Sequence, residues 1–442
     1  MIKLTFIGAG SAAFAKNVLG DCLLADAIND QLEIALYDID RDRLTESEQL
    51  IRAINRIYNQ DRAVIKSYLG VENRKEAFRG ADFLVNAMQV GGYRPSTVID
   101  FEIPKKYGLR QTIADTLGIG GIFRALRTIP VLQDFAEDIM QVCPNAWFLN
   151  YTNPMAMLSN FMQRYTDIKF VGLCHSVQVC SDHLLKALEL PTEGIHDKIA
   201  GINHMAWLLD IRDAQGNDLY PEIRRRAAEK NAKGEHSDMV RYEYIRRLGY
   251  YCTESSEHNA EYNPFFIKQN EPELIERYHI PLDEYPRRCE KHIADWGKQK
   301  EALFAGGKVE HERSLEYASR IIEAMVTNTP FRMGGNVLNT GLIPNLPQLA
   351  TVEVPCMVDA AGIQPTYVGE LPLQLAAMNS SNIYPQLLTV EAAVTHKRDT
   401  LYQAAMMDPH TAAELSIDKI VAMCDELIEA HNHSGFPIGE FH

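Results

Sequence analysis

The N-terminal segment constrains the fold more than any other part of the chain. Leu4–Ile7 is an apolar run typical of a buried strand, and it leads directly into the glycine-rich segment Gly8–Ala13. A helical stretch follows from about Phe14 to Ala27. A buried strand, a tight glycine turn and a helix in this order are typical of the first unit of a parallel α/β sheet.

The same alternation continues through the first half of the chain. Leu32–Tyr37 and Asp82–Met88 have the apolar character of buried strands, and Asp42–Tyr58 between them carries apolar residues at helical spacing. Further strands are expected at Trp147–Asn150 and Phe170–Leu173. Strands that alternate with helices in this way predict a doubly wound parallel sheet, that is, a Rossmann-like domain.

The glycine turn carries a motif for a nucleotide. Gly8, Gly10 and Ala13 match the pattern G-x-G-x-x-G/A, in which glycines allow the backbone to approach a pyrophosphate at the start of a helix. Asp38 ends the next strand, where a carboxylate can bind the ribose hydroxyls of NAD and disfavours the 2′-phosphate of NADP. Arg43 nearby weakens this preference slightly. The residues predicted to contact NAD+ are Gly8, Gly10, Ser11, Ala12, Ala13, Asp38, Arg43 and Gln89.

The regular alternation stops near Leu188, and a different pattern follows. Ala200–Arg212 is predicted to be a strand that ends before a turn at Gln215 and Gly216, and Leu387–Met407 is one of several expected helices. Length also favours more than one domain, since the chain has 442 residues. We therefore predict a Rossmann-like NAD-binding domain over 1–195 and an α+β domain for substrate, metal and oligomerisation over 196–442, arranged as in lactate and malate dehydrogenases.

Charge and composition exclude several kinds of partner. The formal net charge is −15, so a nucleic-acid partner is not expected. No apolar stretch approaches the length needed to span a membrane, and no secretory signal is visible at the N-terminus. Eight cysteines in so long a chain do not form a disulfide framework, which favours a reducing, cytoplasmic location.

Polar residues follow the predicted strands of the first half. They are Asn86 with Gln89, Asp115, Asn150 with Asn153, and Cys174 with His175. Strand ends at the carboxyl edge of such a sheet form the ligand crevice, and His204, from the first strand of the second half, is expected to close it. One thiolate and one imidazole leave open positions on a divalent ion, as a catalytic metal site requires. Asp115 is expected to orient a metal-bound water or to hold a hydroxyl group.

Many segments, in order and almost end to end, carry a family signature. They are TFIGAGS (5–11), NVLGD (17–21), ALYDID (35–40), QTIADTLGIGGIFRALRTIP (111–130), LNYTNPMAM (149–157), VGLCHSVQ (171–178), AGINHMAW (200–207), TESSEHNAEY (253–262), PLDEYPRRC (281–289), NLPQ (345–348) and AAMMDPHTAA (404–413). The chain closely resembles the NAD- and divalent-metal-dependent glycosidases of glycoside hydrolase family 4, in particular their α-galactosidase (melibiase) branch.

The resemblance implies roles for individual residues. Cys174 and His204 would bind the metal, usually Mn²⁺, and Asn153 would hold the sugar hydroxyls, with Asn150 and Arg94 as further candidates for substrate binding. His175 would donate a proton to the leaving group. A reducing agent would be needed, because oxidation of Cys174 removes a metal ligand.

The resemblance also implies a mechanism and a substrate. Terminal α-D-galactose, for example in melibiose, would be released by oxidation at C3 with NAD⁺, deprotonation at C2, elimination, addition of water and re-reduction. Family members use Tyr or Asp as the base, in a loop that here has the sequence TESSEHNAEY. No Asp stands there, so Glu257, His258 and Tyr262 compete for this role, with Glu257 or Tyr262 favoured. Arg287 could also reach the sugar.

Other functions remain open on the sequence alone. Within the family the substrate could be a glucoside, a glucuronide or galacturonide, or a 6-phospho-sugar. A 2-hydroxy-acid dehydrogenase of similar fold would need no Cys/His metal pair, and a nucleotide-sensing protein would bind NAD without turnover. Similar enzymes are usually dimers or tetramers, so a homodimer or homotetramer is expected.

Overall fold

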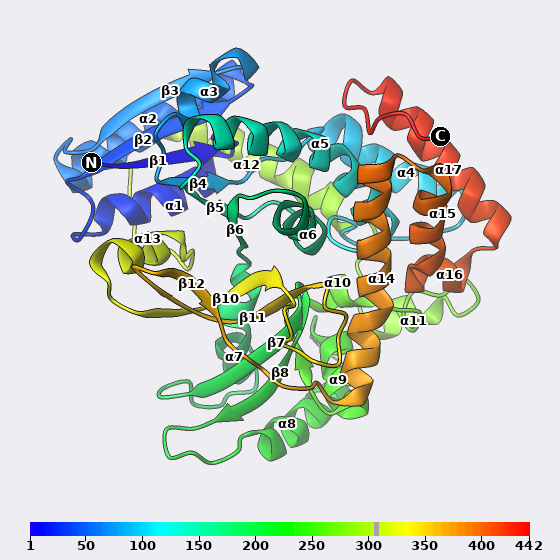
Figure 1. Cartoon of the computed structure of the whole chain (residues 1–442). Helices are drawn as coiled ribbons and strands as arrows, with labels where there is room; N and C mark the ends of the chain where they lie inside the picture. The colour runs from blue at the N-terminus through cyan, green and yellow to red at the C-terminus, as the bar shows by residue number, and fades with distance from the viewer. Residues whose placement is uncertain (235, 305–308) are drawn as a thin grey trace.

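One continuous sheet runs through the computed structural model of the protein (Figure 1). The structure describes residues 1–234, 236–304 and 309–442. Within these residues the sheet has 12 strands in the order β3-β2-β1-β4-β5-β6-β10-β11-β7-β8-β9, and β12 pairs with β11. The six strands from the first half of the chain lie together on one side of this order.

The first six strands form the predicted parallel sheet. They are β1 (Ile2–Ile7), β2 (Leu32–Asp38), β3 (Val64–Leu69), β4 (Phe83–Asn86), β5 (Trp147–Asn150) and β6 (Lys169–Gly172). All five pairings among them are parallel, and the order 3-2-1-4-5-6 is that of a doubly wound dinucleotide-binding domain. The prediction of a Rossmann-like first half is therefore confirmed.

Helices cover both faces of the parallel sheet. They are α1 (Ala12–Leu24), α2 (Arg41–Asn59), α3 (Arg74–Phe78), α4 (Val98–Lys106), α5 (Gly118–Val142), α6 (Met155–Tyr165) and α7 (His175–Ala187). Neighbouring residues of β1 belong to different hydrophobic cores: Phe6 lies in the core that includes Val18 of α1, whereas Ile7 lies in the core that includes Phe123 of α5. Burial on both faces explains why these strands are almost continuously apolar.

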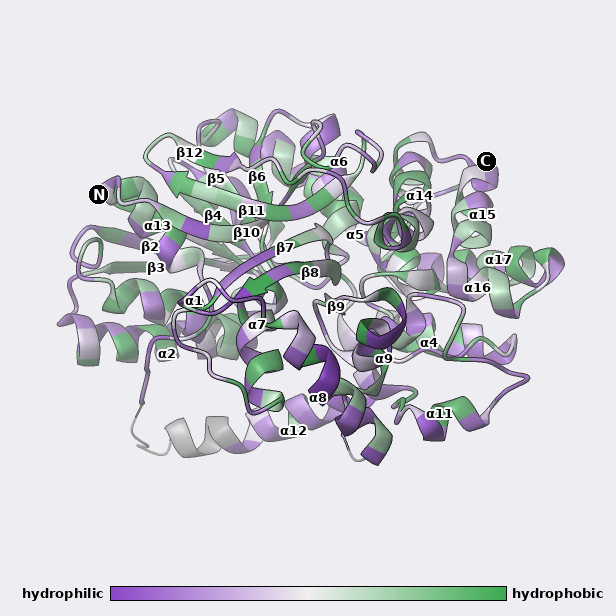
Figure 2. Ribbon diagram, turned by 90° about the horizontal axis from the view of Figure 1, so that it is seen from below, coloured by the Kyte–Doolittle hydropathy of each residue, from purple (hydrophilic) through white to green (hydrophobic). Residues whose placement is uncertain are grey.

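The second half of the chain extends the sheet with antiparallel strands. They are β7 (His196–Ile202), β8 (Met205–Arg212), β9 (Tyr251–Cys252), β10 (Phe331–Leu338), β11 (Thr351–Asp359) and β12 (Gly362–Pro365). The link to the parallel part is the pairing of Asn336 in β10 with Gly172 in β6. In Figure 2, β11 is largely hydrophobic, as expected of a strand in the middle of a sheet. The mixed second half agrees with the predicted α+β character, and the predicted boundary before 196 falls at the start of β7.

The helices of the second half surround these strands and reach back to the first half. They are α8 (Tyr220–Lys233), α9 (Met239–Leu248), α10 (Ser256–Glu261), α11 (Glu273–Arg277), α12 (Glu284–Phe304), α13 (Ala318–Thr327), α14 (Leu373–Thr395), α15 (Arg398–Met407), α16 (Pro409–Glu414) and α17 (Ile417–His433). The long helix α14 packs against α5 and α6 of the first half and also against β7 (Figure 1). It therefore joins the two halves.

Two expected elements are each divided in the structure. The strand expected at Ala200–Arg212 contains the end of β7, a turn at Asn203 and His204, and the whole of β8, and His204 has φ +63°. The helix expected at Leu387–Met407 ends at His396, which has φ +54°, a left-handed conformation that commonly terminates helices. Neither His204 nor His396 was recognised in the sequence as the site of a turn.

The helices found in the described residues include none that combines the length and apolar character of a membrane span.

Candidate active site

The glycine turn between β1 and α1 leaves no room for a side chain at its first position. Gly8 has φ +81°, and a Cβ there would lie 2.7 Å from the backbone nitrogen of Met88. The backbone nitrogens of Gly8 and Ala9 both donate to the carbonyl of Tyr37, at 3.0 and 3.1 Å. The turn is therefore held close to the ends of β2 and β4, as a dinucleotide-binding turn requires.

Asp38 and Arg43 both contact this turn. The Gly10 nitrogen donates to Asp38 Oδ2 at 2.6 Å, and Arg43 Nε donates to the Gly10 carbonyl at 3.2 Å. Ser11 precedes α1 without a side-chain cap, so Ala12 and Ala13 begin a helix whose N-terminal end can receive an anion.

Two of the predicted polar residues are used to hold strand ends together. Asn86 Nδ2 donates to Asn150 Oδ1 at 2.8 Å, and Asn150 Nδ2 donates to the Thr152 carbonyl at 3.0 Å. Asn150 is fully buried. Gln89, also predicted to contact the cofactor, donates to Thr97 Oγ1 at 3.3 Å. Asn86 and Asn150 therefore connect the ends of β4 and β5.

Cys174 and His204 lie together, although they come from opposite halves of the chain. Cys174 lies between β6 and α7, and His204 lies in the turn between β7 and β8. The thiol sulfur, an imidazole nitrogen and a carboxylate oxygen of Glu254 all lie within 4.8 Å of one another. All three side chains are largely buried. This cluster has the ligand types of a divalent metal centre.

A second cluster shares His204 with the first. It consists of Asp115, His204 and His258, whose candidate ligand atoms also lie within 4.8 Å of one another. Glu254 joins the two clusters, since Oε2 is 3.4 Å from His204 Nε2 and Oε1 is 3.5 Å from His258 Nδ1. The other ring nitrogen of His258, Nε2, lies 3.9 Å from Asp115 Oδ1.

Burial controls the charges in these clusters. Burial lowers the pKa of His204 to about 4, so its imidazole is neutral at pH 7. Burial also raises the pKa of the Cys174 thiol well above its ordinary value. For the Glu254 carboxyl, burial by itself would raise the pKa, but the neighbouring imidazole rings outweigh it and lower the pKa to about 2. An ionised carboxylate thus lies between two imidazoles.

Three other predicted residues lie at this site. Tyr262 is fully buried, and its hydroxyl lies 3.2 Å from His204 Nδ1. Asn153 Nδ2 donates to Asp115 Oδ2 at 3.5 Å. His175 is exposed at the start of α7, next to Cys174. Tyr262 thus orients the ring of His204, whereas Asn153 and His175 border the open side of the cluster.

The remaining predicted residues have other partners. The Glu257 carboxylate makes an ion pair with Arg288. Arg94 is 69% exposed and lies 3.9 Å from Glu290, and Arg287 pairs with Glu284 at 2.8 Å. The structure does not bring these three side chains into the two clusters.

Glu254 is the functional candidate that the sequence prediction missed. It lies in the TESSEHNAEY segment, three residues before Glu257, and has φ +64°. This left-handed conformation is uncommon for a residue with a side chain and often marks a functional position. The residue type and segment pointed to this region, but the conformation that turns Glu254 toward His204 cannot be read from the sequence.

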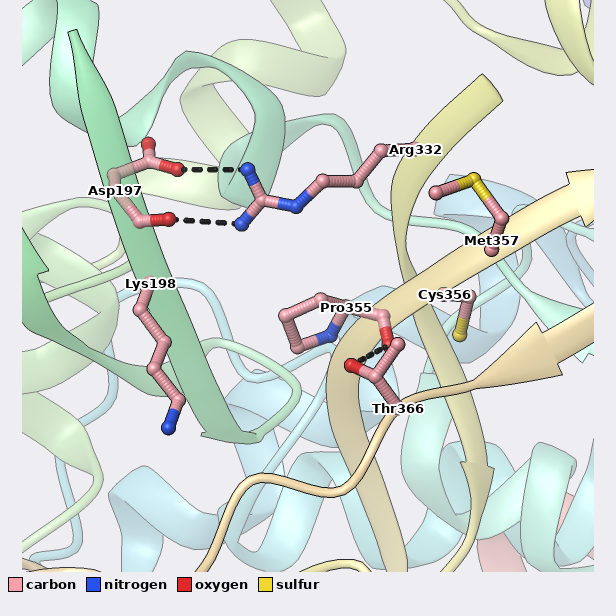
Figure 3. Close-up of a pocket in the computed structure, with 7 residues that line it drawn as sticks. All are labelled: Asp197, Lys198, Arg332, Pro355, Cys356, Met357 and Thr366. Atoms are coloured by element: carbon pink, nitrogen blue, oxygen red, sulfur yellow. Dashed lines mark hydrogen bonds and ion pairs between the residues drawn. The ribbon is translucent and has the colours of Figure 1, made fainter. Parts of the chain in front are cut away.

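A separate hollow lies on another part of the molecule. It has a volume of about 300 Å³ and is lined by residues of β7, β10, β11 and the segment after β12, as Figure 3 shows. Its cationic groups already have partners: Arg332 lies 3.6 Å from Asp197 Oδ1, and Lys198 Nζ donates to the Val368 carbonyl at 2.7 Å. The hollow contains none of the predicted site residues.

Comparison with protein families and curated proteins identifies relatives over nearly the whole chain. Residues 3–190 match the family "Family 4 glycosyl hydrolase", and residues 199–411 match "Family 4 glycosyl hydrolase C-terminal domain". The chain is 62% identical over 431 residues to an α-galactosidase of Bacillus subtilis (strain 168), and the match covers 98% of each of the two chains. It is 33% identical over 440 residues to an α-galactosidase of Rhizobium meliloti (strain 1021), which covers 97% of this chain and 88% of that protein.

Solved structures share the fold. One is a 6-phospho-α-glucosidase from gut microorganisms in complex with NAD and Mn²⁺, with TM-score 0.82 and 20% identity over 100% of both chains. Another is the 6-phospho-β-glucosidase of Thermotoga maritima with manganese, NAD⁺ and glucose-6-phosphate, with TM-score 0.77, 20% identity and coverage of 98% and 99%. These similarities confirm the predicted combination of a Rossmann-like first half with an α+β second half.

Proposed function

Because this chain belongs to the family 4 glycosyl hydrolases, we propose that it releases terminal α-D-galactose from substrates such as melibiose, using NAD⁺ and a divalent metal ion, with Mn²⁺ as the expected ion. The observation that carries the substrate assignment is the 62% identity to an α-galactosidase over 98% of both chains. The cofactor assignment is supported by the glycine turn and by the cluster of Cys174, His204 and Glu254.

The residues around the glycine turn fit a dinucleotide. The absence of space for a Cβ at Gly8 reflects a tight turn packed on the end of β4, and α1 begins at Ala12, directly after this turn. Asp38 lies at the end of β2, where its remaining lone pairs can accept from ribose hydroxyls. Gly8, Gly10 and the first residues of α1 would hold the pyrophosphate, and Asp38 would hold the ribose.

The metal cluster fits a divalent cation. His204 is neutral at pH 7, which is the form of imidazole that binds a metal, and Tyr262 fixes its orientation through Nδ1. The Cys174 thiol would lose its proton on binding, because a coordinating thiol is deprotonated by the ion. Cys174 and His204 would hold the cation, with Glu254 as the third group. Three protein groups leave positions open for sugar oxygens.

The chemistry that the two cofactors supply is reversible acceptance of hydride by NAD⁺ and Lewis acidity at the sugar oxygens by the cation. The chain itself supplies the proton transfers. His258 faces Glu254 and the Ser255 hydroxyl through Nδ1, and this contact orients Nε2 toward Asp115. We assign the role of base to His258, oriented by Glu254, in place of Glu257. His175, exposed beside Cys174, is the proposed donor to the leaving oxygen.

The site also contains groups suited to neutral sugar hydroxyls. Asn153 and Asp115 lie side by side, and together they offer amide N–H donors and carboxylate acceptors. Arg124 is buried, and its Nε donates to the Asn153 carbonyl at 3.2 Å while its guanidinium lies 5.8 Å from the centre of the Tyr285 ring. Asn153 is thus held from both sides, as a residue that binds substrate must be.

The proposal is tested by hydrolysis of melibiose and of nitrophenyl α-galactoside with NAD⁺, Mn²⁺ and a thiol, each omitted in turn. We expect hydrolysis to require all three, and solvent deuterium to appear at C2 of the released galactose. Matched α-glucoside, α-galacturonide and 6-phospho-glycosides serve as controls and should react poorly. Full activity with a chelator and without NAD⁺, or faster hydrolysis of a control sugar, would contradict the proposal.

Two further parts of the proposal concern the assembly and the location. We propose a homodimer or homotetramer, which light scattering of the purified protein tests directly. We also propose a cytoplasmic location, supported by eight free cysteines and by a thiol among the metal-binding residues. Isolation of a protein with oxidised Cys174 from its natural source would contradict that location.

A further inference from the structure

Glu261 makes an unusual set of contacts for a buried carboxylate. It is the last residue of α10 and is 3% exposed. Its Oε2 accepts from the backbone nitrogen of Thr112 at 2.7 Å and from that of Ile113 at 3.2 Å, and its Oε1 accepts from that of Ala114 at 2.8 Å. Three successive N–H groups of one loop thus converge on one side chain, as in the backbone cradles that bind anions.

The loop that Glu261 holds leads directly to the active site. Asp115 follows Ala114, and Ala114 has φ +53°, a left-handed conformation that costs about 1 kcal/mol or more for a residue with a Cβ. Such a conformation persists only where the surroundings impose it. The contact of Glu261 with the Ala114 nitrogen at 2.8 Å supplies this restraint next to Asp115.

The helix that carries Glu261 also carries a second active-site residue. His258 lies one turn earlier in α10, and its Nε2 is 3.9 Å from Asp115 Oδ1. A second contact joins the same two segments, because Thr112 Oγ1 donates to the Glu257 carbonyl at 2.7 Å. The loop before Asp115 belongs to the first half of the chain and α10 to the second, so Glu261 joins the two halves at the site.

We infer that Glu261 is a positioning residue, which holds Asp115 against His258 and His204 and thereby controls the affinity of the site for the divalent cation and the sugar. This inference rests on the proposed function for the identity of the sugar, but its effect on the cation can be measured without turnover.

The decisive variant is Glu261→Gln, which keeps the shape of the side chain. Whichever way its amide is turned, an NH₂ group replaces one oxygen and faces the N–H of Thr112 or of Ala114. Asp115 lies within 4.8 Å of the proposed ligand His204, and loss of an outer group that keeps a metal ligand in place typically weakens metal binding by about 10- to 100-fold. We expect Glu261→Gln to weaken Mn²⁺ binding, measured by EPR of the free ion, by about tenfold or more, and to lower kcat/KM.

A matched control is Glu414→Gln. The Glu414 side chain is 5% exposed, accepts a hydrogen bond from the backbone nitrogen of Gln269 at 2.8 Å and forms an ion pair with Lys268. It lies in α16, and these two partners are not site residues. It therefore measures the general effect of replacing a buried glutamate. NAD⁺ affinity, followed by protein fluorescence, is the second control, since the glycine turn belongs to other elements.

The outcomes separate the inference from the proposed function. Weaker Mn²⁺ binding in Glu261→Gln, with NAD⁺ binding equal to that of the wild type and with Glu414→Gln unaffected, supports the positioning role even if the wild type does not hydrolyse galactosides. Equal Mn²⁺ affinity and equal kcat/KM in Glu261→Gln and Glu414→Gln would overturn it. If Glu261→Gln fails to fold, Glu261→Asp takes its place, because it keeps the charge but moves the carboxylate oxygens away from the N–H groups of Thr112 and Ala114. Its Mn²⁺ affinity and kcat/KM are then compared with those of Glu414→Gln.

Discussion

Replacement of Glu353 by glutamine should change how the stability of the protein depends on pH. Glu353 lies in β11, is fully buried, and accepts hydrogen bonds from Asn336 Nδ2 at 3.0 Å and from Asn203 Nδ2 at 3.4 Å. Burial raises the pKa of this carboxyl from its ordinary value of 4.5 to about 7, although the two amides act in the opposite direction. The negative charge of Glu254 adds to the increase.

The direction and size of the effect follow from this pKa. Below pH 4.5 the carboxyl is protonated in both the folded and the unfolded protein, so its ionisation does not lower the free energy of unfolding. Between pH 4.5 and about 7 the unfolded chain releases the proton while the folded protein keeps it, and stability falls as pH rises. At about 1.4 kcal/mol for each pH unit, the free energy of unfolding should fall by about 3 kcal/mol over this range.

Glu353→Gln removes this ionisation and keeps the shape and an acceptor oxygen. Urea unfolding of the metal-free protein, followed by tryptophan fluorescence to which the buried Trp207 contributes, gives the free energy of unfolding at each pH. We expect the difference between the variant and the wild type to shift in favour of the variant by about 3 kcal/mol from pH 4.5 to pH 8. Glu440→Gln, at an exposed position, should give a constant difference. A constant difference for Glu353→Gln as well would refute the reasoning.

Three other substitutions test the binding sites. Cys174→Ser should weaken Mn²⁺ binding by more than about 100-fold, because even the loss of an outer partner of a metal ligand can cost that much. Unchanged Mn²⁺ affinity in an EPR titration would show that Cys174 is not a metal ligand. Gly8→Ala places a Cβ 2.7 Å from a backbone nitrogen at φ +81°, so we expect a loss of about 2 kcal/mol or more in NAD⁺ binding, seen as an affinity lower by about 30-fold. Tyr262→Phe removes one hydrogen bond to His204 and should weaken Mn²⁺ binding by about fivefold. A much larger loss of kcat with normal Mn²⁺ binding would instead make Tyr262 the base.

The first half of the fold could be predicted because its strands are buried on both faces. Runs such as Leu32–Tyr37 are apolar at every position except Glu33, and helices with clear periodicity separate them. The strand β3 was not predicted, because Val64 and Lys66 are exposed at the sheet edge and break the apolar pattern. In the second half the hairpin turn at Asn203 and His204 was missed, because the segment has no Asn-Gly or Asp-Gly pair of the kind that marks a two-residue hairpin turn.

The sequence located the centre of the candidate site but not all of its members. Cys174 and His204 could be placed at the edge of the sheet because each follows a short apolar run, whereas their role as metal ligands was implied by the family resemblance. The identity of the third group depends on long-range geometry: Glu254 reaches His204 through its left-handed backbone, while the carboxylate of Glu257, three residues later, pairs with Arg288. Residues of the same type in one segment cannot be distinguished by spacing alone.

The separation of the two proposed metal ligands is controlled by strands that come much later in the chain. Gly172, Asn336, Glu353 and Gly201 form one row across β6, β10, β11 and β7. Cys174 follows Gly172 by two residues, and His204 follows Gly201 by three. Asn336 donates to both the Gly172 carbonyl, at 3.3 Å, and the Glu353 carboxylate, so polar contacts continue along the row.

A side chain would be crowded at both ends of this row. A Cβ at position 172 would lie 2.5 Å from the sulfur of Met155, and one at position 201 would lie 2.7 Å from the Met205 carbonyl. At these positions β6 therefore packs closely against α6, and β7 packs closely against β8. In the sheet β10 and β11 lie between β6 and β7. Because a metal site tolerates little change in the distance between its ligands, substitutions in β10 and β11 should alter Mn²⁺ affinity although neither strand supplies a ligand. The site is thus divided among segments on both sides of residue 196, and neither predicted domain would form it alone.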